Sequence, residues 1–174
     1  MALLSVAVAV LTALVLLDLV LTGAVIRRLR ETEKRLIEIT TPPDTGMRPG
    51  DPMPEFTSPD GGLSRTDLAG TQALIGFFSA GCHHCPAQAD RLAARADDLA
   101  AMGITVVSVL TVTGGDTDGL SPRLEKAGRL IVETGAGDMT NAFQVEATPT
   151  FLLFDDAGVL LNRDHGLDDV LGGR

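Results

Sequence analysis

Two cysteines and two histidines lie together in the stretch GCHHCP, residues 81–86. Cys82 and Cys85 are the only cysteines of the chain, and His83 and His84 are two of its three histidines. A C-x-x-C pair can cycle between a dithiol and a disulfide, and cysteine combined with histidine can bind zinc. Disulfide exchange and metal binding are therefore the first two candidate chemistries.

The neighbouring residues predict a strand before this stretch and a helix after it. Residues 73–79, ALIGFFS, are a short apolar run typical of a buried strand. Residues 86–102 are rich in alanine, begin with a proline and end before Gly103, a pattern that favours a helix. We expect Cys82 at or just before the N-terminus of this helix and Cys85 about one turn along it. Unpaired N–H groups there favour a thiolate, which is the nucleophile in disulfide exchange.

The two histidines between the cysteines are expected to shape the site. Their N–H groups, or their positive charge when protonated, favour the thiolate form of Cys82, and a more stable reduced state makes the disulfide more oxidising. Four adjacent residues at a helix start cannot all point at one ion, and only His165 is available elsewhere. A zinc or copper site, or a role in metal delivery, is thus an alternative to the dithiol, and we expect neither a bound metal nor a dissociable cofactor.

The rest of the domain alternates between strands and helices. We predict strands at 104–112 and 129–133, short helices at 122–127 and 138–143, a hairpin of 151–155 with 159–163, and a frayed final turn from 167. This order predicts an α/β fold with a mixed sheet flanked by helices. Thr148 and Pro149 precede the strand at 151–155; proline is tolerated where a strand begins, and the default for the bond between the two is trans.

The first 26 residues predict a membrane anchor. Residues 2–26 contain a single charged side chain, Asp18, and about 20 apolar residues suffice to cross a hydrocarbon core. A cleaved signal peptide is the alternative, but the start lacks Lys and Arg and the apolar run is long. Asp18 is expected near one end of the span, as a tolerated polar residue. Residues 27–52 then read as a helical stalk and a linker rich in proline and glycine, leading to a domain at 53–174.

The charge distribution bears on partners and on the membrane side. The residues after Met53 have 8 basic and 17 acidic side chains and so account for the whole net charge of −9. The chain has no Trp or Tyr. An acidic domain without stacking platforms argues against nucleic-acid binding. The basic residues that follow the anchor would, taken alone, keep the domain in the cytoplasm; they are Arg27, Arg28, Arg30, Lys34 and Arg35.

Three segments, FFSAGCHHC, VEATPTFLLFDDAGVLL and GDPMPEF, resemble the thioredoxin-like proteins. The closest type is the membrane-anchored TlpA-like thiol–disulfide oxidoreductases, including those of methylamine dehydrogenase maturation, and the resemblance covers about residues 50–170. It implies that Cys82 attacks and Cys85 resolves. It also implies a cis bond before Pro149, with Thr148 part of the edge where a substrate peptide docks, while His84 resembles the residue of strongly oxidising members.

The resemblance has further implications, and the sequence departs from it in places. It implies protein thiol or disulfide clients, a redox-recycling partner and a domain outside the cytoplasm, against the charge rule. Gly81 replaces the usual Trp, and Gln88 replaces an acidic residue. A peroxiredoxin-like peroxidase is a second enzyme alternative in the same fold family. Ser79 matches the hydroxyl of its motif, but Ile75 stands where that motif has proline.

Overall fold

A computed structural model of the chain describes residues 46–114, 119–135 and 137–172. The predicted anchor at 2–26, with Asp18, and the stalk and linker up to residue 45 lie outside these ranges. Within them, no helix has the length and apolar character needed to cross a membrane. The anchor therefore stays a prediction, as does the domain boundary at residue 53.

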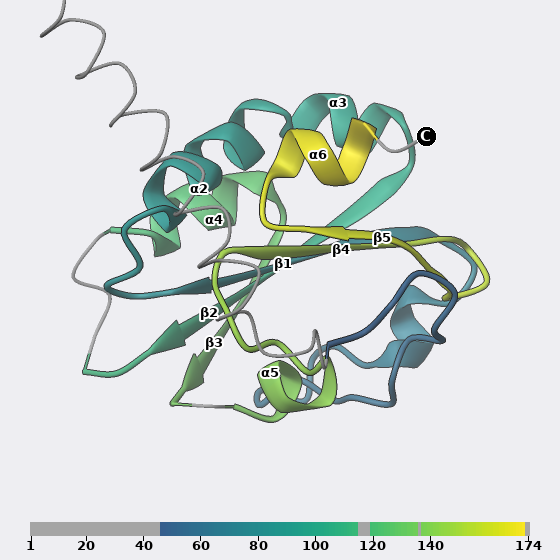
Figure 1. Ribbon diagram of the computed structural model, residues 1–174, viewed down its shortest axis with the longest axis horizontal. Coiled ribbons are helices and arrows are strands. Elements are labelled where there is room, and N and C mark those ends of the chain that lie inside the picture. The colour runs from purple at the N-terminus through teal and green to yellow at the C-terminus, as the bar shows by residue number, and fades with distance from the viewer. Residues whose placement is uncertain (1–45, 115–118, 136, 173–174) are drawn as a thin grey trace, which may run out of the picture. The chain divides into compact units, whose positions relative to one another are not determined.

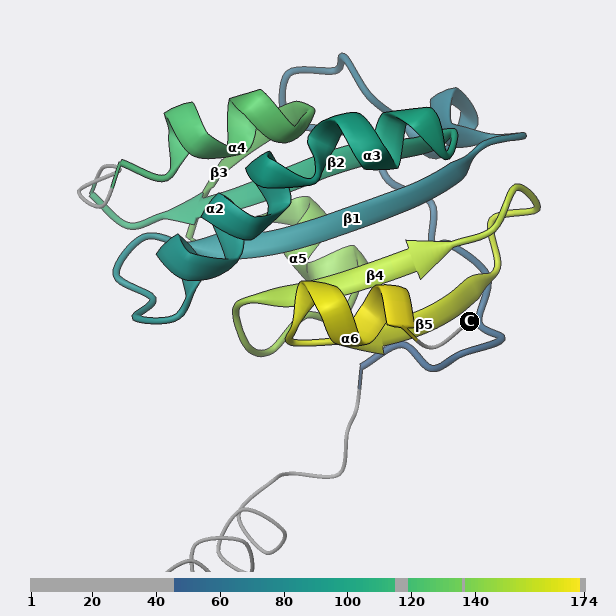
Figure 2. The same cartoon turned by 90° about the horizontal axis from the view of Figure 1, so that it is seen from above.

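The centre of the domain is a five-stranded mixed sheet in the order β3-β2-β1-β4-β5 (Figure 2). β1 pairs in parallel with β2, which pairs in parallel with β3, while β4 runs antiparallel to both β1 and β5. The strands are β1 (Gln72–Ser79), β2 (Ile104–Val112), β3 (Arg129–Thr134), β4 (Thr150–Phe154) and β5 (Leu160–Asp164). The predicted mixed sheet is confirmed, with strand limits that differ from the predicted ones by at most one residue.

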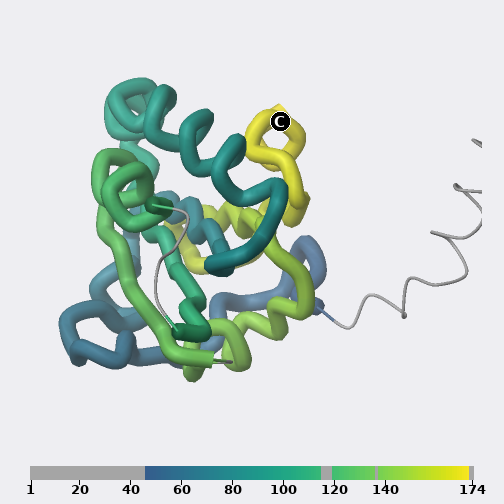
Figure 3. Tube along the Cα trace, turned by 90° about the vertical axis from the view of Figure 1, so that its left-hand side faces the viewer, coloured from purple at the N-terminus to yellow at the C-terminus, as the bar shows by residue number. Residues whose placement is uncertain are grey.

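Helices cover both faces of the sheet (Figure 1), and the end-on view separates the layers (Figure 3). One face carries α2 (Cys85–Ala94), α3 (Ala96–Ala101), α4 (Ser121–Ala127) and α6 (Leu167–Gly172). The other carries α5 (Asp138–Ala142) and the 3₁₀ helix η1 (Arg65–Leu68). Because β1 lies between the two layers, its side chains from 73 to 78 are buried on both faces, which accounts for its unbroken apolar run.

Phenylalanine rings fill the core beneath α5. The ring of Phe143 lies 5.3 Å from that of Phe56, 5.5 Å from Phe77 and 6.0 Å from Phe154, measured between centroids. Met47 belongs to the same core and is only 6% exposed. The segment from residue 46 to η1 therefore packs on this face of the sheet and fixes the side of the domain opposite α2.

The predicted single helix at 86–102 is two helices in the structure, and its start differs by one residue. It begins at Cys85, because the Cys85 N–H donates to the Cys82 carbonyl at 3.2 Å and closes a turn directly before the helix. It is also divided at Arg95, whose φ of −103° and ψ of 5° leave the helical region between α2 and α3. Cys85 is consequently the first residue of α2 and does not lie one turn along it. Gly103 follows α3 at a φ of +74°, a conformation that favours glycine, as the predicted helix end requires.

The C-terminal residues form a packed helix where a frayed turn was predicted. Leu167 and Val170 are fully buried, so α6 covers its part of the sheet. The Asn162 side chain in β5 donates to the carbonyls of Asp169 and Val170, at 3.2 and 3.0 Å, and satisfies groups that a short helix leaves free at its end. Contacts from β5 thus stabilise a helix too short to be stable alone.

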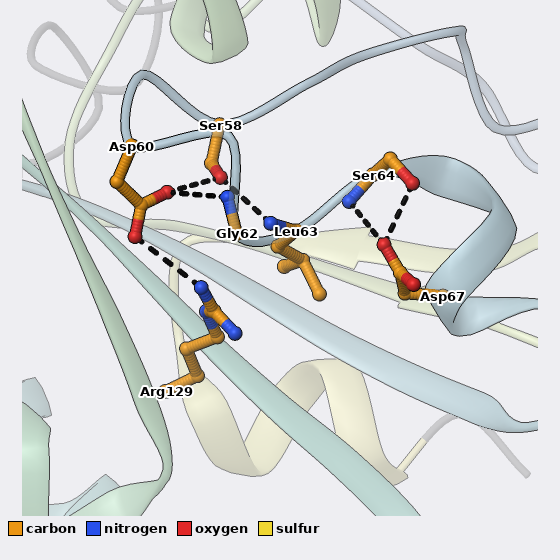
Figure 4. Close-up of polar contacts among 7 residues, drawn as sticks. All are labelled: Ser58, Asp60, Gly62, Leu63, Ser64, Asp67 and Arg129. Atoms are coloured by element: carbon orange, nitrogen blue, oxygen red, sulfur yellow. Dashed lines mark hydrogen bonds and ion pairs between the residues drawn. The ribbon is translucent and has the colours of Figure 1, made fainter.

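Two carboxylates hold the loop that leads into η1 (Figure 4). Asp60 accepts from the Ser58 hydroxyl and from the Gly62 N–H, and it pairs with Arg129 at 3.3 Å. Asp67 accepts from the hydroxyl and the N–H of Ser64, at 2.7 and 2.8 Å. These hydrogen bonds lower the pKa of both carboxyl groups below the ordinary value of 3.8, because they stabilise the charged form.

Candidate active site

Cys82 and Cys85 are joined by a disulfide whose Cα atoms lie 5.4 Å apart. Cys82 lies in the short connection from β1 to α2 and is half-buried, whereas Cys85 at the start of α2 has no exposed surface. Of the two cysteines, only Cys82 therefore has surface that a reagent or partner protein can contact. The attacking role of Cys82 and the resolving role of Cys85 stay predictions.

The connection before Cys82 is shaped by Gly81. Its φ of +85° lies in the left-handed region, which side chains with a Cβ rarely adopt. The flanking backbone is fixed, since the Ala80 N–H donates to Thr111 O at 2.9 Å and the Cys82 N–H to Ser79 O at 3.1 Å. The backbone thus explains why glycine stands where the resembling proteins have Trp, and no ring covers the disulfide from this position.

The loop before β4 faces the disulfide from the other side. The Thr148-Pro149 bond is cis, as the resemblance implied and against the trans default for such bonds. The carbonyl oxygen of Thr148 lies 3.3 Å from Cys82 Sγ. Thr148 and Pro149, which are 66 residues and more away in sequence, are thereby brought to the reactive cysteine. Pro149 is buried and Thr148 is half-buried.

Two features of this geometry act in opposite directions on the reduced form of Cys82. The N-terminus of α2 favours a thiolate, as expected from the sequence. The Thr148 carbonyl can accept a hydrogen bond from a thiol and repels a thiolate, so this contact favours the protonated form. The expectation of a strongly oxidising disulfide took only the first feature into account.

The two histidines of the motif lie on the surface. His83 and His84 are exposed, and their rings contact each other edge to face at 5.4 Å between centroids. Across the three described ranges, no group of three or more His, Cys, Asp and Glu side chains is placed to hold a metal ion. The contribution of either histidine to the site stays a prediction.

A groove of about 330 Å³ lies beside the Thr148 loop. Residues that carry a hydroxyl group make up much of its lining: Ser79, Thr111, Thr113, Thr140 and Thr148. The Ser79 hydroxyl is 3.3 Å from the Ala80 carbonyl, to which it donates. The residue that matched the hydroxyl of the peroxidase motif is thus engaged with its own backbone.

Three residues around the site had been given no contact or role from the sequence. His165, to which no role had been given, has Nδ1 2.7 Å from the Pro149 carbonyl. Gln88 accepts a hydrogen bond from the Leu167 N–H at 3.2 Å. Glu133 in β3 is 2% exposed and accepts from backbone N–H groups at the start of α5. Only Glu133 carried a sequence signal, because an acidic residue at a core-facing position of a predicted strand needs a partner.

Similarity to solved structures agrees with this architecture. The thioredoxin domain of a thiol-disulfide oxidoreductase from Bacteroides vulgatus is 20% identical and superimposes with a TM-score of 0.60, covering 72% of this chain and 94% of that one. A secreted disulfide oxidoreductase of Mycobacterium tuberculosis, homologous to E. coli DsbE, is 17% identical with a TM-score of 0.55, covering 70% and 93%. A putative thiol:disulfide interchange protein DsbE from Chlorobium tepidum is 22% identical with a TM-score of 0.52, covering 69% and 86%.

These likenesses confirm the thioredoxin-like fold. No curated protein matches the chain at a significant level. The match to a protein family extends from the segment before η1 to the middle of β5, and so includes the disulfide and the loop before β4. Residues 49–162 match the model of the AhpC/TSA family, and the chain belongs to that family.

Proposed function

We propose that this chain is a thiol–disulfide oxidoreductase that exchanges its Cys82–Cys85 disulfide with protein clients. The observation that carries the proposal is the unequal burial of the two cysteines, Cys82 before α2 and Cys85 at its start, with the Thr148 carbonyl 3.3 Å from Cys82 Sγ. A structural disulfide would gain nothing from exposing one partner beside a docking loop. Disulfides with an accessible sulfur are the ones that take part in exchange.

The reaction proceeds through a mixed disulfide. In the reductive direction the Cys82 thiolate attacks a client sulfur, the client S–S bond breaks, and the leaving client thiolate takes up a proton. The Cys85 thiol then loses its proton and attacks Cys82 Sγ, which breaks the mixed disulfide and releases the second client thiol. The client gains two electrons, and a redox partner must reduce the resulting Cys82–Cys85 disulfide. The reverse sequence oxidises a client dithiol.

The TlpA-like subtype and the membrane location belong to the same proposal. Residues 2–26 anchor the chain, and the domain lies outside the cytoplasm, where disulfides persist. The apolar composition of 2–26 supports the anchor, and the resemblance supports the outward orientation against the basic residues at 27–35. Labelling of reduced Cys82 in intact cells by a membrane-impermeant maleimide tests the side: labelling without lysis supports an outward domain, and labelling only after lysis contradicts it.

The unequal burial gives a sharp test of the mechanism. In Cys85→Ser, the accessible Cys82 can form a mixed disulfide that nothing resolves, so covalent client complexes should accumulate. In Cys82→Ser, the remaining thiol is buried and should trap no client. Redox titration of the wild-type chain in glutathione buffers should also show a reversible intramolecular disulfide. Equal trapping by both variants, or insulin reduction by Cys82→Ser, would refute the assignment.

Assays of the wild-type chain distinguish the proposed exchange of disulfides from the peroxidase alternative. Peroxidase activity requires a cysteine activated for peroxide, but Ile75 is fully buried in β1 where that motif has proline, and the Ser79 hydroxyl donates to Ala80 O. We therefore expect the reduced chain to turn over insulin and not to consume hydrogen peroxide faster than a small dithiol does. Rapid peroxide consumption that depends on Cys82 would favour the peroxidase.

A further inference from the structure

Three consecutive carbonyl groups before β4 each meet a different partner. The Thr150 hydroxyl donates to the Ala147 carbonyl at 2.7 Å. The Thr148 carbonyl faces Cys82 Sγ at 3.3 Å. The Pro149 carbonyl lies 2.7 Å from Nδ1 of His165, in the turn between β5 and α6. The Thr148 carbonyl therefore lies between two carbonyls that are each held by a side chain, Ala147 by Thr150 and Pro149 by His165.

The hydrogen-bonding roles in this group follow from its chemistry. A carbonyl oxygen can only accept, so Nδ1 of His165 must carry the proton. Nδ1 is also 3.2 Å from the Thr150 hydroxyl oxygen, whose own proton is directed to Ala147. Thr150 is fully buried, whereas His165 is exposed, so an exposed ring reaches inward to hold buried backbone.

The turn that carries His165 is itself fixed to the helix of the disulfide. The Gly166 N–H donates to Asp164 Oδ1 at 2.9 Å, and the Leu167 N–H donates to Gln88 Oε1 at 3.2 Å. Gln88 lies one turn after Cys85 in α2. Contacts therefore lead from the disulfide through α2 and the turn to Pro149, and back through Thr148 to Cys82.

We propose that His165 is a positioning residue, which holds the loop at 147–149 at the distance from Cys82 that a client peptide needs in order to dock. The inference rests on the proposed function, because it concerns how clients meet the same disulfide. His165 touches the backbone of the loop and not the sulfur. Its loss should therefore weaken reactions with protein clients and leave the intrinsic reactivity of Cys82 unchanged.

The test compares His165→Ala, which removes the donor, with His165→Asn, which keeps an N–H on the atom equivalent to Nδ1. Asp168→Asn is the control, since this exposed residue of α6 pairs with Arg95 at 2.8 Å and does not contact the loop. With the full-length chain, losing one hydrogen bond should lower kcat/KM for insulin about fivefold to tenfold, mainly through KM. His165→Asn should recover most of this loss, and the rate with a small disulfide such as glutathione disulfide should not change in any variant.

A second measurement does not depend on catalysis. Amide hydrogen exchange at Thr150, which pairs with Phe77 in the sheet, should accelerate in His165→Ala, but not in His165→Asn or Asp168→Asn, because the loop opens more often when its anchor is lost. If the wild-type chain does not reduce insulin at all, the proposed function fails while this exchange still decides the role of His165. Exchange unchanged in His165→Ala would overturn the inference, as would equal losses with insulin and with the small disulfide.

Discussion

Glu133 offers the strongest test of how the fold holds the start of α5. Its carboxylate is 2% exposed and accepts three hydrogen bonds: from the Met139 N–H at 2.7 Å, and from the Thr140 N–H and hydroxyl at 3.2 and 2.9 Å. The residue before α5 is Gly137, which has no side chain to cap the helix. Glu133 supplies this cap from β3, the strand that precedes α5 in the chain, with a negative charge at the helix N-terminus.

The size of the effect follows from these contacts. Glu133→Ala leaves two N–H groups without partners, one of them buried, and should lower the free energy of unfolding by about 2–4 kcal/mol. Glu133→Gln keeps one acceptor oxygen but places an NH₂ group against the donors of Thr140, so we expect a loss of about 1–2 kcal/mol. Both losses are large compared with a total stability of about 5–15 kcal/mol for a domain.

Urea denaturation of the full-length chain, with the disulfide kept oxidised, measures these losses as shifts of the midpoint at constant m-value. Glu125→Gln is the matched control, because Glu125 is an exposed acidic residue of α4. Equal midpoints for Glu133→Gln and Glu125→Gln would refute the capping role. So would a Glu133→Ala protein as stable as the wild type.

Three further predictions concern packing and pH. A Cβ on Gly76 would lie 2.9 Å from a ring carbon of Phe78, so Gly76→Ala should cost about 1–3 kcal/mol in urea denaturation, and an unchanged midpoint would contradict the packing argument. The Ser108 hydroxyl is buried and has no hydrogen-bond partner among the residues that the structure describes, so Ser108→Ala should leave stability unchanged or raise it by about 1 kcal/mol, measured the same way; a clear loss would show that the hydroxyl has a partner. Folding lowers the pKa of Asp60 and Asp67 below the ordinary value of 3.8. Their contribution to stability is therefore present above pH 3.8, and it is lost as the pH falls below this value and through the lower pKa of the folded state. Asp67→Asn should be less stable than the wild type at neutral pH and approach it in acid, as thermal melts between pH 2 and pH 7 would show; a constant difference across that range would contradict it.

The sequence predicted those parts of the fold that depend on local patterns. The strand at 104–112 was located without error, because β-branched residues and a glycine at its start mark it clearly. The division at Arg95 was not predictable in this way, since the alanine-rich run continues through it without proline or glycine. The order of α6 depends on Asn162 and on burial against the sheet, which a sequence of six residues cannot reveal.

The candidate site shows the same division between local and long-range information. Cys82 and Cys85 were found from their spacing and from the strand before them. Pro149 was linked to them only through the resemblance to thioredoxin-like proteins, because nothing in the spacing of 66 residues brings Thr148 to the sulfur. His165 lay further along the chain still, and its role depends on the turn between β5 and α6 placing Nδ1 against a carbonyl.

Because Gly81 stands where the resembling proteins have Trp, access to the disulfide must be limited by other groups. A Trp at that position would cover the sulfur with a ring, but the left-handed backbone of Gly81 places no side chain there. Cys82 is nevertheless only half exposed, so other groups limit its exposure, and the Thr148 carbonyl at 3.3 Å is one of them. If the proposed function is right, the loop at 147–149 both meets the client and limits the exposure of Cys82. A change within this loop should therefore alter the choice of client, whereas a change at His83 or His84, which lie on the surface, should alter the reactivity of Cys82 alone.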